Sequence, residues 1–132
     1  MGAALRLALE DARIQPSALG YISAHGTATE RGDIAESQAT ASVLGSIIPI
    51  SSMKSYLGHT LGACGAIEAW WAIEMMNRQW FAPTLNLSSP DPRCAPLAHI
   101  TGDGMAIDTQ FIMSNNFAFG GINTSLIFAR HE

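Results

Sequence analysis

One stretch, Ser51–Met76, constrains the fold of this chain more than any other: SSMKSYLGHTLGACGAIEAWWAIEMM. It begins as the end of a strand, passes through a turn of small residues that carries Lys54 and His59, and enters a helix over about 61–77. That helix is apolar on so many faces that we expect it to be buried. Cationic and titratable groups set between glycines beside such a helix indicate a functional site.

Glu68 lies on this apolar helix. A buried carboxylate without a partner would cost several kcal/mol, so Glu68 needs a cationic or hydrogen-bonding neighbour. Lys54 and His59 are the natural candidates. A plain buried ion pair that holds the turn is the simpler explanation, and it is compatible with a functional role.

Two histidines stand where ligand contacts are common. His25 follows a short predicted strand, Tyr21–Ala24, and loops beyond strand ends usually carry the ligand contacts of α/β folds. For His25 alone, a structural hydrogen-bonding role is an equal alternative. His59 directly precedes the helix, whose N-terminal potential favours a neutral imidazole and an anionic partner. A neutral imidazole can donate an N–H to a developing oxyanion.

Cys64 invites a catalytic interpretation, because it lies near a helix start and five residues after His59. It stands in a run of Gly and Ala where any small apolar residue suffices, so we expect a packing role. A zinc site formed by His25, His59 and Cys64 lacks a fourth ligand at recognisable spacing, and no metal is expected. Without CxxC spacing, Cys64 and Cys94 are expected to be free thiols of a cytoplasmic protein.

The remaining pattern predicts helices alternating with short buried strands, an α/β layered architecture in a single domain over residues 1–132. Asp33 and Glu36 resemble an acidic capping box at the start of a second helix, and Gly45 is placed to end it. The tail predicts a hairpin of central strands buried on both faces. The other predicted elements are a helix over 3–14, a strand over 47–51, an irregular connection over 81–103, and hairpin strands over 111–116 and 122–129.

The composition argues against some classes of binding partner. The net charge is −4 without a Lys/Arg cluster, which argues against a nucleic-acid ligand. The apolar runs are too short to span a bilayer and no signal peptide is visible, so no membrane partner is expected. Only 14% of the residues are charged, against roughly 25% in an ordinary soluble domain. We therefore expect more chain or a second subunit to cover much of the surface.

Five motifs occur in a fixed order: AHGTAT, GDIAES, SSMKSYLGHTLGACGAIEA, APTLNL-x-x-PDP and SNNFAFGGINTSLIF. Together they resemble the C-terminal half of β-ketoacyl-acyl carrier protein synthases, the condensing enzymes of the thiolase-like fold. The resemblance runs from about residue 3 to residue 130. It implies a central mixed sheet with helices on its faces and a C-terminal β-hairpin.

The resemblance also implies a reaction: decarboxylative Claisen condensation of an acyl thioester with malonyl-acyl carrier protein, in fatty acid or polyketide biosynthesis. His25 and His59 match the two family histidines that stabilise the enolate formed on decarboxylation. Lys54 matches the active-site lysine and Glu68 its partner carboxylate.

Substrate contacts follow from the same resemblance. Thr27 and Thr29 match the threonines that bind the phosphopantetheine arm. Phe119 matches the gating phenylalanine, and Gly120 follows it in the gating loop, where the Phe119 N–H is expected to contribute to an oxyanion hole. No cofactor is expected beyond that arm, which acyl carrier protein supplies as partner, and the full-length protein is expected to be a homodimer.

This sequence departs from the family pattern in two ways. The nucleophilic cysteine belongs to the N-terminal half of the family, and the chain is expected to start after the first strand of the C-terminal half. The isolated chain should therefore be inactive and expose a sheet edge. Cys64 stands where the family usually has alanine, and Ala118 where many relatives have glycine, which narrows the backbone choices of the gating loop.

Two alternatives remain open at this point. The chain could belong to a non-catalytic partner subunit akin to a chain-length factor, which lacks the cysteine. It could also be an inactive truncated fragment. The retained histidines and lysine favour the enzyme, because a silent subunit has no need of them.

Overall fold

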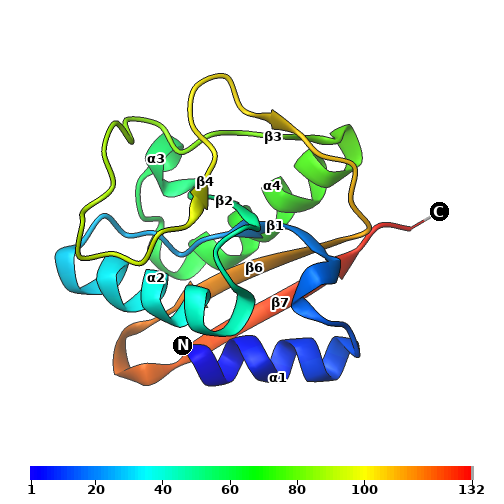
Figure 1. The fold of residues 1–132 in the computed structure, drawn as a ribbon, viewed down its shortest axis with the longest axis horizontal. Helices are drawn as coiled ribbons and strands as arrows, with labels where there is room; N and C mark the ends of the chain where they lie inside the picture. Colours follow the sequence, from blue (N-terminus) through cyan, green and yellow to red (C-terminus); the bar gives the residue numbers. More distant parts are fainter. Residues whose placement is uncertain (132) are drawn as a thin grey trace.

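A five-stranded sheet forms the centre of the computed structural model, which describes residues 1–131 (Figure 1). The strand order is β4-β2-β1-β6-β7. The first four strands run parallel and β7 is antiparallel to β6, so the sheet is mixed, as expected. The strands are β1 (Leu19–Ser23), β2 (Pro49–Ser51), β4 (Ala98–His99), β6 (Phe111–Phe117) and β7 (Asn123–Ala129).

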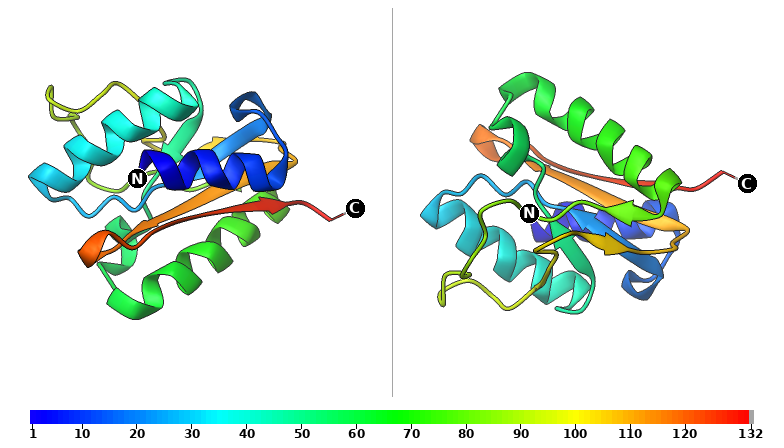
Figure 2. Two further views of the ribbon diagram at one scale, coloured as in Figure 1. Left: turned by 90° about the horizontal axis from the view of Figure 1, so that it is seen from below. Right: turned by 90° about the horizontal axis from the view of Figure 1, so that it is seen from above.

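Helices cover both faces of this sheet (Figure 2). The helices α1 (Gly2–Ala12) and α2 (Glu30–Leu44) lie on one side, and α4 (Cys64–Arg78) lies on the other. A single helical turn, α3 (Lys54–Leu57), follows β2. A small antiparallel pair, β3 (Trp80–Phe81) and β5 (Met105–Ala106), stands apart from the main sheet. No helix within residues 1–131 is both long and apolar enough to cross a bilayer.

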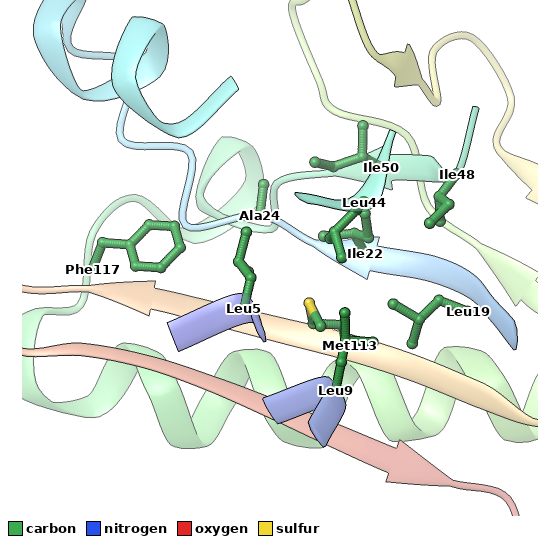
Figure 3. Close-up of a cluster of buried hydrophobic side chains, with 10 residues drawn as sticks. All are labelled: Leu5, Leu9, Leu19, Ile22, Ala24, Leu44, Ile48, Ile50, Met113 and Phe117. Atoms are coloured by element: carbon green, nitrogen blue, oxygen red, sulfur yellow. The ribbon is translucent and has the colours of Figure 1, made fainter. Parts of the chain in front are cut away.

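The core consists of two clusters, one on each face of the sheet. Alternation along the strands sends Ile22 and Met113 to the first face, where Leu5 and Leu9 of α1 meet them (Figure 3). The neighbouring positions, among them Tyr21 and Ile112, pack on the second face. The cluster there also contains Met53, Ala72, Met75, Met76, Phe81 and Ile100.

The second helix begins earlier than predicted. Its N-cap is Thr29 and its first residue is Glu30, so Asp33 is not the N-cap. The capping-box interpretation is wrong because the Glu36 side chain leaves the helix end and bonds to a loop. The predicted end is confirmed: Gly45 is the C-cap, with a φ of 81° that favours glycine.

Two burial predictions are wrong. The buried residues of α4 lie along one stripe, and Trp70 is 60% exposed. The hairpin of β6 and β7 is confirmed, but only β6 is central. Because β7 lies at the edge of the sheet, its side chains alternate between half-buried and exposed, and Leu126 is 50% exposed. The predicted irregular connection over 81–103 also contains the short edge strand β4.

The hairpin offers a matched test of the core. Replacing Ile112, which is fully buried, by alanine should lower the free energy of unfolding by about 2–5 kcal/mol. Replacing Leu126 on the edge strand should change it by only about 0.5 kcal/mol. Urea denaturation followed by circular dichroism measures both. Equal losses would contradict the assignment of β6 to the core and β7 to the edge.

Candidate functional site

The carboxyl ends of three neighbouring parallel strands build the site. Ser23 of β1 pairs with Ser51 of β2 on one side and with Ser114 of β6 on the other. The chain therefore leaves all three strands at one edge of the sheet. His25 follows β1 and Lys54 follows β2, and both emerge at this edge.

A close approach fixes the loop after β1. The backbone of Gly26 has a φ of 44°, and a β-carbon there would lie 2.6 Å from the side chain of Ser52. Ser52 Oγ donates to the Gly26 carbonyl at 3.0 Å. Only glycine, which has no β-carbon, combines this φ with this contact, and this explains why a glycine follows His25.

Glu36 of α2 holds this loop from the other side. Its two carboxylate oxygens accept the backbone N–H groups of His25 and Gly26, each at 2.8 Å. Glu36 is 6% exposed, and burial raises the pKa of its carboxyl while these two N–H donors oppose that rise. Sequence reasoning missed this role. The available signal was its place in GDIAES, just after the AHGTAT loop.

A buried ion pair stands next to His25. Lys54 Nζ lies 2.5 Å from Glu68 Oε1 and 3.2 Å from His25 Nδ1. Lys54 and His25 are each 8% exposed, and Glu68 is 3% exposed. Of the two partners predicted for Glu68, the structure selects Lys54.

His25 is neutral near pH 7. Burial, the ammonium of Lys54 and the neighbouring His59 together lower its pKa from 6.5 to about 4. Because the Lys54 ammonium has only donors, His25 Nδ1 accepts from it. The single imidazole proton of His25 is therefore on Nε2.

His59 meets His25 edge-on. The ring centroids are 5.3 Å apart and the rings are inclined at 87°. His59 is exposed, and its Nδ1 accepts the backbone N–H of Leu61 at 3.1 Å. In its neutral form His59 thus also carries its proton on Nε2. The fold brings the two predicted histidines together with the same tautomer.

The thiol of Cys64 belongs to the same site. Cys64 is the first residue of α4, is 7% exposed, and donates to Asn116 Oδ1 of β6 at 3.1 Å. Asn116 was not recognised from the sequence. Both cysteines are free, and Cys94 lies half-buried in the loop before β4.

Of the residues predicted to contact substrate, Thr27 lines the cavity that also contains His59. The hydroxyls of Thr27 and Thr29 bond to each other at 2.8 Å. Phe119 is 94% exposed in the turn between β6 and β7, next to Gly120. The φ of Ala118 is −88°, which any residue adopts, so this conformation of the turn does not require glycine there.

A cavity of about 560 Å³ opens beside the site. It reaches from the two catalytic candidates Lys54 and His59 to the space beneath the loop before β4. Its polar lining includes Thr27, Asp33, Glu36, Lys54, His59 and His99.

Comparison with known proteins shows the family of this chain. Residues 1–88 match the family model described as the β-ketoacyl synthase C-terminal domain. The chain belongs to the β-ketoacyl synthase family. It is 38% identical over 132 residues to 3-oxoacyl-[acyl-carrier-protein] synthase 2 of Synechocystis sp., an alignment that covers 98% of this chain and 32% of that enzyme.

Solved ketosynthase structures share the fold. A β-ketoacyl synthase from Burkholderia phymatum is 65% identical and superposes with a TM-score of 0.98, over 99% of this chain and 32% of that one. A ketosynthase solved with its type II polyketide synthase acyl-carrier protein is 36% identical with a TM-score of 0.93, over 99% and 33%. The chain thus spans about a third of these relatives and corresponds to their C-terminal part.

Glu36 gives a direct test of the site's construction in this ketosynthase chain. Glu36→Gln places an amide NH₂ against one of two backbone N–H donors, so we expect a loss of about 1.5–3 kcal/mol in the free energy of unfolding. The matched control is Glu74→Gln, which removes the exposed partner of Arg78 and should cost less than about 0.5 kcal/mol. Urea denaturation separates the two. A Glu36→Gln loss as small as that of the control would contradict the clamp.

Proposed function

We propose that this chain supplies the decarboxylation half of a ketosynthase active site, in which His25 and His59 stabilise the enolate of a malonyl thioester. The observation that carries the proposal is the pair of imidazoles in contact, each with Nδ1 occupied as an acceptor. Each neutral ring keeps Nε2–H as its only donor. Two such donors suit one oxygen that gains negative charge.

The chemistry follows from these donors. The bond between the malonyl carboxylate and its α-carbon breaks and carbon dioxide leaves. The electron pair moves toward the thioester oxygen, where the two Nε2–H groups stabilise the enolate. The enolate carbon then attacks the carbonyl carbon of a second, acyl thioester, and that thiolate leaves. The thiol that carries this acyl group is assigned to the rest of the ketosynthase, since neither Cys64 nor Cys94 lies in the family's nucleophile motif.

Lys54 and Glu68 prepare the donors in this scheme. The Lys54 ammonium opposes protonation of His25 and fixes its tautomer through Nδ1. Glu68 balances that ammonium, so the site gains an oriented, neutral imidazole without an uncompensated buried charge. Both residues act through His25 and position it.

Substrate delivery is proposed to use acyl carrier protein. Thr27 and Thr29 bind the phosphopantetheine arm, and Phe119 with Gly120 forms the gate over the histidines. The exposure of Phe119 and the hydroxyls at the approach support this assignment. The solved relative bound to its acyl-carrier protein supports the partner. We further propose a homodimeric full-length enzyme that acts in the cytoplasm, in keeping with the two free thiols.

The proposal is tested by adding the remaining two thirds of a ketosynthase in trans and measuring carbon dioxide release from malonyl-acyl carrier protein. His25→Ala and His59→Ala should each lower the rate by about 10²–10³-fold, because each removes one oxyanion donor. The matched control is His131→Ala, which replaces an exposed histidine near the C-terminus and should leave the rate unchanged. The proposal would be contradicted if the folded, assembled pair released no carbon dioxide, or if neither histidine substitution lowered the rate.

A further inference from the structure

Three metal-ligating side chains meet in the site, and the proposed condensation does not use them as a set. The thiol of Cys64, one nitrogen of His25 and one carboxylate oxygen of Glu68 lie within 4.8 Å of one another. All three residues are more than nine-tenths buried. The proposed condensation assigns no chemistry to Cys64, so the presence of its thiol in this cluster calls for another explanation.

The cluster already holds a positive charge. The ammonium of Lys54 lies between His25 Nδ1 and Glu68 Oε1, at 3.2 and 2.5 Å. It leaves one acceptor unused: Glu68 Oε2 is buried and has no hydrogen-bond partner among the described residues. A buried carboxylate oxygen without a donor is costly, and a divalent cation bound by the Glu68 carboxylate would remove that cost.

The chemistry of the donors selects the kind of cation. Thiolate, imidazole and carboxylate are the ligands of Zn²⁺, while Mg²⁺ and Ca²⁺ prefer oxygen ligands alone. Three protein ligands with a water in the fourth position form a common zinc arrangement. Neighbouring ligand atoms around zinc stand roughly 3–4 Å apart, given bonds of about 2.0–2.3 Å. Side-chain rotations of modest size therefore close the cluster.

We propose that Cys64, His25 and Glu68 form a binding site for a zinc-class divalent cation, which competes with the Lys54 ammonium for the place between His25 and Glu68. On binding, the Cys64 thiol loses its proton to solvent and its sulfur becomes a ligand in place of the bond to Asn116. The Lys54 ammonium moves away from His25 Nδ1. The Lys54 side chain that the cation would displace also lines the cavity beside the site.

These ligands differ from the set considered from the sequence, which combined Cys64 with both histidines. Glu68 takes the place of His59, whose Nδ1 is held by the Leu61 N–H. A metal bound here would occupy His25. Inhibition of condensation by the metal rests on the proposed function, but metal binding itself does not.

The test uses Co²⁺ as a spectroscopic substitute for zinc on the whole 132-residue chain. A 1:1 complex with a sulfur-to-cobalt charge-transfer band, displaced by Zn²⁺, is expected. Cys64→Ala should abolish the band and weaken binding by about 100-fold or more, since even an outer-shell loss costs about 10–100-fold. Cys94→Ala is the matched control and should keep both the charge-transfer band and the affinity for Co²⁺. A wild-type chain without the band, or a band lost in Cys94→Ala and kept in Cys64→Ala, would overturn the site.

Lys54→Met tests the competition. Removing the ammonium should tighten Co²⁺ binding by at least about tenfold, since Glu68 is then left without a cation. Adding Cys64→Ala to this variant should remove the gain. Binding that is unchanged or weaker in folded Lys54→Met would contradict the shared position. If Lys54→Met folds only with metal, a metal-dependent thermal transition that Cys64→Ala abolishes supports the site, and one that persists without Cys64 contradicts it.

Discussion

The rest of the site depends on one buried interaction, the ion pair of Lys54 with Glu68. Two charges taken out of water are expensive, and the pair is stable only because each charge meets the other at hydrogen-bonding distance. It ties the turn after β2 to the helix α4, and through His25 Nδ1 it reaches the loop after β1. Loss of either partner leaves an uncompensated buried charge, which typically costs about 3–5 kcal/mol.

The sheet makes this interaction geometrically available. Parallel pairing of β1, β2 and β6 brings three loops to one edge, so residues far apart in the sequence become neighbours. Phe117 at the end of β6 packs against the His25 ring with centroids 6.1 Å apart. Glu36 then fixes the His25 backbone, while Lys54 fixes its ring. Backbone and side chain of one histidine are thus held by two separate buried charges.

Much of this could be predicted from the sequence, and the limits have physical causes. A carboxylate on an apolar helix needs a cationic partner. The sequence therefore narrowed the partner of Glu68 to two residues, Lys54 and His59. Glu36 could not, because an acidic residue near a helix start satisfies local capping rules as well as it satisfies a distant loop. The two-residue strand β4 carries no periodic signal and forms only because β2 offers an edge. Trp70 is exposed because the helix packs on the sheet through one stripe only, and apolar residues on several faces of a helix do not reveal which face is buried.

The site as proposed requires His25 to be a neutral imidazole whose proton is on Nε2. Nitrogen-15 NMR of the histidine rings, recorded through a pH titration of the folded chain, tests it most directly. We expect the Nε2–H tautomer at neutral pH and a protonation midpoint for His25 near pH 4. Between that midpoint and the ordinary value of 6.5 the unfolded chain binds the extra proton, so stability should rise with pH across this window. A midpoint near 6.5, or a proton on Nδ1, would contradict this description of His25.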